Sequence, residues 1–345
     1  MSTQMSFWET PAVRQPLKTN LDHLVSPSEY DHIIVAFSGG KDSLACVLHL
    51  LDIGVSKSSM ELWHHDIDGR EGSKLMDWPV TRDYCRSIAE ALGIPIYYSW
   101  REGGFEREML KHNQRTAPVC YETPVGINKS GGIDGKISCR RMFPQVSASL
   151  TTRWCSGTLK VDVCSAAVSG QERFNGKRVI IVTGERAEES KNRACYKAFE
   201  PHRTNAEARK KRTVHQWRPV HQWTEKQVWD LIAKYRIAPH PCYKLGWARC
   251  SCSACIFGSK NQWASLALIN PAQVKVIADY EIEFGKTIHR TLPVTALVAQ
   301  GTPYANMNLD DIKAALSETF DGFAIMPEGT WKLPAGAFGE NAGPT

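Results

Sequence analysis

The sequence predicts an α/β fold: a doubly wound parallel sheet with helices on both faces. Short apolar runs alternate along the chain with segments whose apolar residues recur at helical spacing. The predicted strands at residues 32–37 and 178–183 contain short continuous apolar runs, Ile33 to Phe37 and Val179 to Val182, which are typical of strands covered on both faces. Polar or glycine-rich residues follow these runs directly, at the edge where such sheets bind ligands.

Helix and strand signals place the individual elements. The second helix has Pro79 near its start and Gly93 after its end, and Asn270 with Pro271 opens a later helix. Thr224 and Gln227 form a capping box. We expect irregular loops over residues 100–150, where periodicity is weak. The predicted strands are residues 32–37, 60–66, 94–99 and 178–183, and the predicted helices are residues 44–51, 77–92, 228–235 and one from 270.

The chain of 345 residues divides into a central domain with two extensions. Residues 31–285 are the predicted nucleotide-binding domain, with a cysteine-rich segment at 240–258. Residues 1–30 and 286–345 are the predicted extensions. The end of the chain beyond Pro327 is rich in Gly, Pro and Ala, so we expect it to be mobile.

Composition and charge favour a globular protein with an anionic substrate. The chain has 42% hydrophobic and 23% charged residues, and its formal net charge is +6. It has no apolar run long enough to cross a bilayer, and its N-terminus lacks the pattern of a signal peptide, so we expect a cytoplasmic protein without membrane contact. The basic run at residues 209–212 is more typical of a solvated loop than of a phosphate-tracking patch.

A phosphate-sized anion fits the turn between the first predicted strand and helix. Glycines let the backbone approach a ligand closely, hydroxyls and a lysine add donors, and the helix start presents free amides. The carboxylate in this turn would repel phosphate unless it binds Mg²⁺ or caps the helix. An ordinary charged turn is the alternative. The six residues are Ser38, Gly39, Gly40, Lys41, Asp42 and Ser43.

A second set of candidates follows the strand at residues 178–183. Gly184 ends this strand, and Arg186 and Arg193 come seven residues apart, a spacing that puts them on one face of a helix. We expect both arginines to face one anion. The alternative is a salt-bridged helix start in which Glu188 or Glu189 pairs with an arginine.

Clustered cysteines point to metal or redox chemistry rather than to disulfides. The chain has eleven cysteines, which could suggest a disulfide scaffold, but such scaffolds are short and secreted. Two intervening residues let Cys252 and Cys255 bind one metal ion or cluster. Cys242 and Cys250 lie close by in sequence, and Cys155 comes from an Arg-Trp-Cys motif.

These motifs, in this order, resemble the phosphoadenosine phosphosulfate (PAPS) reductase family of the PP-loop ATP pyrophosphatase superfamily. The resemblance runs from about residue 33 to residue 284. The motifs that carry it are Ser38 to Ser43, Asp77-Trp78-Pro79-Val80-Thr81, Arg153-Trp154-Cys155 with Leu159-Lys160, Gly184-Glu185-Arg186 with Glu189-Ser190 and Arg193, His240-Pro241 with Tyr243, and Cys252-Ser253-Ala254-Cys255-Ile256.

The resemblance implies roles for these residues. The 38–43 loop and Gly184 would hold an adenine nucleotide, Asp66 would accept a hydrogen bond from its ribose, and Arg186 and Arg193 would contact phosphate or sulfate. Lys41, Asp42 and Arg186 would take part in catalysis. The family often binds an iron–sulfur cluster through a Cys-Cys pair and a later Cys-x-x-Cys. Residue 156 is Ser here, so the ligands expected are Cys155, Cys252, Cys255 and Cys242, with Cys250 as the second choice for the fourth and zinc as the alternative metal.

The missing tail cysteine favours ATP over PAPS as the nucleotide. PAPS reductases use a cysteine in a C-terminal tail, and this chain has no cysteine after Cys255. We therefore expect an enzyme that uses ATP and Mg²⁺, releases pyrophosphate and takes part in sulfur transfer. A sulfur donor or thiol reductant protein would be its partner, and tRNA or DNA its acceptor. The alternatives are a PAPS or adenosine phosphosulfate reductase using Cys195, an ATP-binding subunit of a sulfate adenylyltransferase, and a non-catalytic nucleotide-sensing or DNA-binding module.

Overall fold

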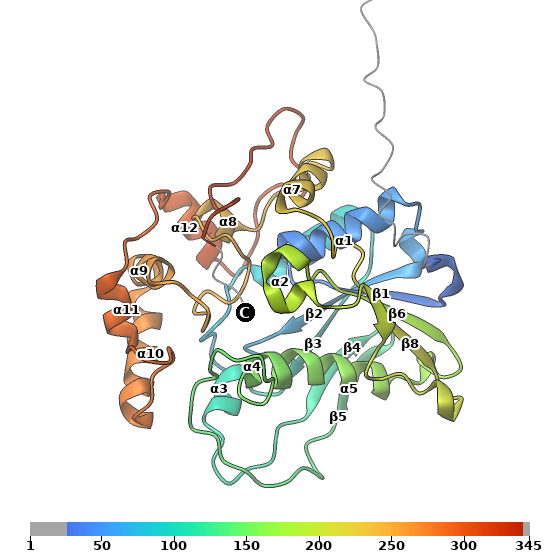
Figure 1. The fold of residues 1–345 in the computed structure, drawn as a ribbon, viewed down its shortest axis with the longest axis horizontal. Helices are drawn as coiled ribbons and strands as arrows, with labels where there is room; N and C mark the ends of the chain where they lie inside the picture. The colour runs from blue at the N-terminus through green and yellow to red at the C-terminus, as the bar shows by residue number, and fades with distance from the viewer. Residues whose placement is uncertain (1–25, 341–345) are drawn as a thin grey trace, which may run out of the picture.

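The computed structural model describes residues 26–340, and an eight-stranded sheet forms its centre (Figure 1). The strand order is β5-β4-β3-β2-β1-β6-β8-β7. The five strands from β3 to β8 in this order run parallel, which confirms the predicted parallel sheet, while β4, β5 and β7 add antiparallel edges. The strands are β1 His32–Ala36, β2 Met60–Asp66, β3 Ile96–Arg101, β4 Val119–Thr123, β5 Gly126–Ser130, β6 Arg178–Val182, β7 Phe199–Pro201 and β8 Thr213–Trp217.

Helices cover both faces of the sheet, as the unbroken apolar runs predict. Helices α1 (Lys41–Asp52) and α2 (Thr81–Leu92) lie on one face, and α5 (Asp162–Gly170) lies on the other (Figure 1). Strand β1 serves both cores, because successive side chains of a strand point to opposite faces. Val35 packs into the core beside α1 and α2, whereas Ile34 packs into the core beneath α5.

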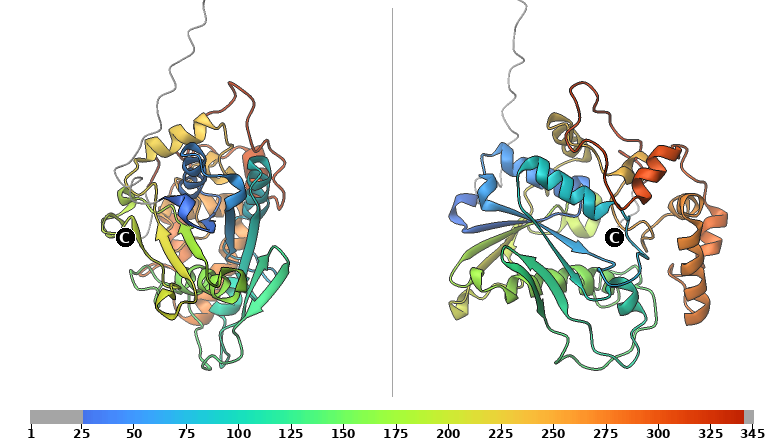
Figure 2. Two further views of the ribbon diagram at one scale, coloured as in Figure 1. Left: turned by 90° about the vertical axis from the view of Figure 1, so that its right-hand side faces the viewer. Right: turned by 180° about the vertical axis from the view of Figure 1, so that it is seen from behind.

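The C-terminal helices form a separate layer beside the sheet. Helix α7 (Glu225–Lys234) packs on α1. The other helices of this layer gather to the left in Figure 1 and to the right in the rear view of Figure 2. They are α8 Pro241–Lys244, α9 Lys260–Ile269, α10 Pro271–Phe284, α11 Val294–Gln300 and α12 Leu309–Leu316. Within residues 26–340, no helix is long and apolar enough to pass through a membrane.

Capping residues in the sequence correctly place the starts of two helices, α7 and α10. Thr224 and Gln227 form the predicted capping box of α7, and Asn270 caps α10 ahead of Pro271. Helix α2 begins at Thr81, four residues later than residue 77, where the sequence places its start.

Two expectations about irregular segments are wrong. Residues 100–150 contain α3 (Gly104–Met109) and the β4–β5 hairpin in addition to loops. The segment beyond Pro327 contacts the body of the fold through residue 340: the Gly336 amide donates to the Tyr243 carbonyl at 2.7 Å. The division into a domain with two extensions stays a prediction, and residues 1–25 and 341–345 lie outside the described part of the chain.

Candidate functional site

The 38–43 loop forms a tight, hydrogen-bonded turn between β1 and α1. Gly39 has a φ of 77°, which a glycine adopts without strain. The Ser43 hydroxyl donates to the Gly40 carbonyl at 2.9 Å and accepts from the Ser38 amide at 3.2 Å. The loop therefore brings its hydroxyls and the start of α1 to one point at the carboxyl edge of the sheet.

Lys41 is buried within this turn and already has partners. Its Nζ donates to the Ala248 carbonyl at 3.0 Å and lies 3.8 Å from Glu225. Its backbone amide donates to the Tyr243 hydroxyl at 2.9 Å, and the same hydroxyl accepts from the Cys250 amide at 3.2 Å. The segment from Tyr243 to Cys250 thus covers the lysine that the sequence assigns to phosphate.

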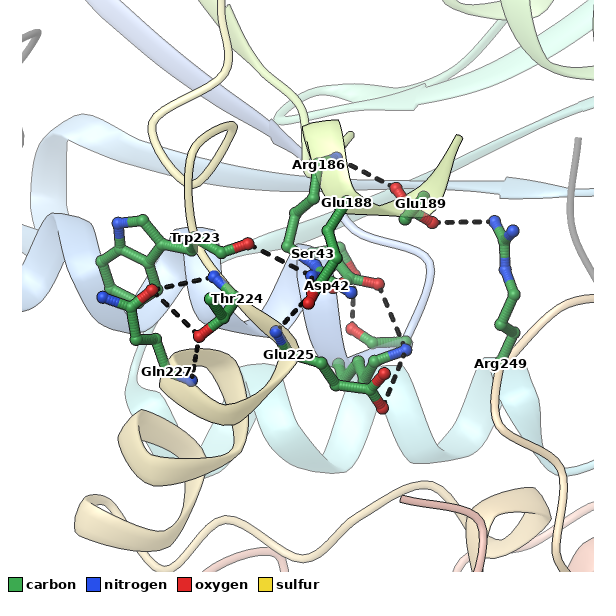
Figure 3. Close-up of polar contacts among 12 residues, drawn as sticks. Asp42, Ser43, Arg186, Glu188, Glu189, Trp223, Thr224, Glu225, Gln227 and Arg249 are labelled. Atoms are coloured by element: carbon green, nitrogen blue, oxygen red, sulfur yellow. Dashed lines mark hydrogen bonds and ion pairs between the residues drawn. The ribbon is translucent and has the colours of Figure 1, made fainter. Parts of the chain in front are cut away.

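Arg186 reaches the same point from the loop after β6 (Figure 3). Its side chain is buried, its Nε lies 2.5 Å from Asp42 Oδ1, and its Nη1 contacts Glu188 at 2.5 Å and the Trp223 carbonyl at 3.2 Å. Burial by itself would raise the pKa of Asp42, but the positive charges of Lys41 and Arg186 outweigh it and lower that pKa. Asp42 is therefore a carboxylate at neutral pH.

Arg193 joins the site through an ion pair rather than along one continuous helix with Arg186. It pairs with Glu189. Glu189 also contacts Arg249 at 3.0 Å (Figure 3). The spacing argument is wrong in its geometry, because Ser190 is extended (φ −171°) and separates a 3₁₀ turn from α6 (Lys191–Ala194). The salt-bridged arrangement is present, and contact of the two arginines with one anion stays a prediction.

Buried acidic groups end β2. Asp66 lies 3.5 Å from both His64 Nε2 and Arg70 Nε, and burial raises its pKa. Asp68 accepts the backbone amides of Met76 and Asp77 at 3.0 and 2.8 Å. Burial raises the pKa of Asp68 to about 7 despite these hydrogen bonds. A ribose contact by Asp66 stays a prediction.

The raised pKa of Asp68 predicts a pH-dependent stability. Between an ordinary value of 3.8 and about 7, the unfolded chain loses its proton while the folded chain keeps it, so the free energy of unfolding falls as pH rises. The shift corresponds to at most roughly 4 kcal/mol. Asp68→Asn keeps an oxygen acceptor for the two amides and removes the titration. We expect the variant to gain stability over the wild type between pH 5 and pH 8 in urea unfolding.

Asp230→Asn, at an exposed position of α7, is the control for this prediction. Parallel pH profiles of stability for Asp68→Asn and the wild type would contradict it.

The cysteines divide into two groups. Cys155, Cys252 and Cys255 lie near enough to Lys160 to act on its charge: burial alone would lower the pKa of Lys160, but these thiols and Asp77 raise it. Cys242 is fully buried with Cys250 and His240 instead.

The group of His240, Cys242 and Cys250 is compact. A ring nitrogen of His240 and the two Sγ atoms all lie within 4.8 Å of one another. Burial and the adjacent Cys250 raise the pKa of Cys242 well above its usual value, whereas the hydrogen bond with Cys242 and the nearby His240 lower that of Cys250. In the described range 26–340, no other three His, Cys, Asp or Glu donors meet so closely.

The four cysteines predicted to hold an iron–sulfur cluster lie in two groups. Such a cluster needs convergent thiolates, and Cys242 lies with a different group from Cys155, Cys252 and Cys255. The full ligand set stays a prediction, and we assign no reaction step to a cluster.

The basic run lies away from this site. Residues 209–211 are exposed and immediately precede β8, at the amino edge of the parallel strands, whereas the 38–43 loop follows the carboxyl end of β1. Arg212 is buried and donates to the Thr204 carbonyl. The arrangement fits the solvated-loop interpretation.

Comparison with known proteins matches part of the chain to a known domain family. Residues 140–257 match the family model of the phosphoadenosine phosphosulfate reductase domain. The resemblance to the PAPS reductase family is confirmed. At the level of class, the match indicates a domain of an enzyme family that binds nucleotides and takes part in sulfur-related chemistry.

Two relatives in sequence and two solved structures are similar to parts of this chain. An uncharacterized 37.8 kDa protein of Escherichia phage 186 is 28% identical over 262 residues, 72% of this chain and 74% of the relative. The tRNA-specific 2-thiouridylase MnmA of Anaplasma marginale is 34% identical over 110 residues, 31% of this chain and only 28% of that protein.

The two solved structures share little sequence with this chain. The PAPS reductase of Candida auris, solved as a phosphate complex, has a TM-score of 0.36 at 18% identity, over 66% of this chain and 91% of its own. The FMN adenylyltransferase of Candida glabrata, with FMN and an ATP analogue, has a TM-score of 0.36 at 11% identity over 66% of this chain and 57% of its own.

Sequence reasoning missed several residues that contact the loop. Glu225 lies between the two residues of the predicted capping box, and nothing in the sequence signals its approach to Lys41. The Ala248 carbonyl is a backbone group, so no side chain in the sequence indicates its contact with Lys41. Tyr243 and His240 belong to the His-Pro-x-Tyr motif, which was the available signal for this side of the site.

Proposed function

We propose that this chain is a PP-loop enzyme that binds ATP with Mg²⁺, releases pyrophosphate and activates an acceptor for sulfur transfer. The observation that carries the proposal is the convergence of the 38–43 loop, Lys41 and Arg186 at the start of α1. Free amides, hydroxyls and buried cations at a helix start are suited to phosphate. The intact loop favours ATP over PAPS.

The charges of the site support a role for Mg²⁺. Lys41 and Arg186 are already paired with carboxylates, chiefly Asp42 and Glu188. A triphosphate brings several further negative charges, which these paired cations do not balance. A divalent cation bound by Asp42 and the phosphates would restore the balance and neutralise the leaving pyrophosphate.

In this proposal the loop and the two arginines bind different parts of the nucleotide. Residues 38–43 hold the β- and γ-phosphates, and the Nζ of Lys41 leaves the Ala248 carbonyl to contact them. Arg186 and Arg193 hold the α-phosphate or the acceptor, and Asp66 accepts a ribose hydroxyl. Charge stabilisation of this kind is commonly the largest single contribution to catalysis.

The sulfur acceptor is proposed as a nucleic acid, served by a sulfur donor or thiol reductant protein. The similarity to a tRNA-specific thiouridylase over 110 residues supports this choice. The position of the basic run at residues 209–212 does not support a nucleic-acid acceptor, because the run lies at the amino ends of the parallel strands and the 38–43 loop lies at their carboxyl ends.

The test compares ATP with PAPS in protein purified without oxygen. We expect Mg·ATP to yield AMP and pyrophosphate in the presence of a tRNA or DNA pool, and chelation of Mg²⁺ to stop the reaction. Sulfite release from PAPS with a thiol reductant, at a rate above pyrophosphate release, would overturn the choice of ATP. Failure of every nucleic-acid arm to raise pyrophosphate release would overturn the choice of acceptor.

A further inference from the structure

The group of His240, Cys242 and Cys250 has the composition of a zinc site. Its three donor atoms lie within 4.8 Å of one another. His240 and Cys242 are fully buried, and Cys250 is half-buried. His240 and Cys242 come from the start of α8, and Cys250 comes from the cysteine-rich segment, so one ion would join the two segments.

The hydrogen bonds of His240 leave one ring nitrogen suited to a metal. Nδ1 accepts from the Cys242 amide at 3.2 Å, so it carries a lone pair and the ring proton resides on Nε2. Nε2 lies 3.3 Å from the Thr81 hydroxyl. A ligating histidine ordinarily donates its other N–H to such a partner, which fixes the ring and its tautomer. A metal on Nδ1 would replace one long hydrogen bond and keep the bond to Thr81.

Charge and donor type select the ion. Two thiolates and a neutral imidazole around Zn²⁺ sum to zero, so the buried centre carries no net charge. Soft sulfur donors favour zinc over calcium or magnesium, and two cysteines with one histidine leave the fourth tetrahedral position for a non-protein ligand.

We propose that His240, Cys242 and Cys250 bind one Zn²⁺ ion beside the 38–43 loop. A Cβ added to Gly40 would lie 3.3 Å from the Cys250 Cβ, so the ion would lie next to the nucleotide loop. The site is separate from Cys155, Cys252 and Cys255, and it does not depend on the proposed reaction.

Cobalt binding tests the site directly. Full-length protein from zinc-depleted medium, reduced and kept under argon, is titrated with Co²⁺. We expect thiolate-to-cobalt charge transfer and the visible bands of a tetrahedral ion. Thr81→Val, which only releases the histidine ring, should weaken binding by roughly tenfold. Cys250→Ser removes a ligand and should weaken binding more than Thr81→Val does. Cys252→Ser, from the other cysteine group, is the matched control and should bind as the wild type does.

Alkylation of the wild type keeps the test independent of whether variants fold. Zn²⁺ should protect Cys250, the half-buried thiol of the site, mapped by mass spectrometry, and leave Cys252 and Cys255 reactive. Absence of the cobalt spectrum in the wild type would overturn the proposal. Loss of the spectrum in Cys252→Ser with retention in Cys250→Ser would do so as well, and so would Zn²⁺ protection confined to Cys252 and Cys255.

Discussion

Replacing Lys41 with methionine is expected to lower the rate of pyrophosphate release from Mg·ATP by at least roughly 100-fold, the scale of losing one preorganised group that stabilises developing charge. Methionine has a similar length and fills the buried space, so the loss is mainly that of the positive charge near Asp42. The Ala248 carbonyl loses its donor, which costs about 1 kcal/mol of stability. Radiolabelled pyrophosphate measures the rate, and urea unfolding measures the stability.

Lys226→Met provides the matched control. Lys226 is an exposed lysine of α7 that pairs with Asp230, so its loss removes the same charge without touching the loop. Its rate should equal that of the wild type. A Lys41→Met enzyme that is folded and keeps the wild-type rate would remove the lysine from the mechanism.

The sequence was sufficient to predict the parts of the fold that follow local rules. β2 occupies residues 60–66 as predicted, and the caps of α7 and α10 lie where their side chains indicate. These elements are set by apolar periodicity and by hydrogen bonds within a few residues. The positions of Lys41 and Arg186 at the loop follow from the same rules, because both come after strands that neighbour each other in the sheet.

The contacts that complete the site depend on long-range packing, which one sequence does not reveal. Tyr243 and Ala248 reach Lys41 from about 200 residues away, and only the placement of α8 determines that they do so. The cysteines behave alike in this respect. Sequence spacing predicts that Cys252 and Cys255 lie together, but it gives no reason to place Cys242 in a different group. The structure does so, because Cys242 is buried beside His240. The seven-residue spacing of Arg186 and Arg193 likewise favours one continuous helix, but the extended backbone at Ser190 interrupts it.

Gly184→Ala is expected to destabilise the protein and to displace the start of α1. A Cβ on residue 184 would lie 2.7 Å from the Asp42 carbonyl carbon and 2.9 Å from the Ser43 amide nitrogen. These are backbone atoms, so no side-chain rotation relieves the contact. Overpacking of this kind costs roughly 1–3 kcal/mol, and here the strain falls on the loop that is proposed to hold phosphate. Urea unfolding and the KM for ATP measure the two effects.

The two effects distinguish a packing role from a role in shaping the site. If α1 moves away as a unit, the KM for ATP should rise together with the loss of stability, because the amides and Ser43 leave their positions. Gly135→Ala is the control, since a Cβ there meets no atom within 4 Å and the residue is exposed. A Gly184→Ala protein with wild-type stability and unchanged KM would show that the end of β6 and the start of α1 are farther apart in solution than the structure has them. The close approach of Arg186 to Asp42 would then need another explanation, because it relies on the same junction.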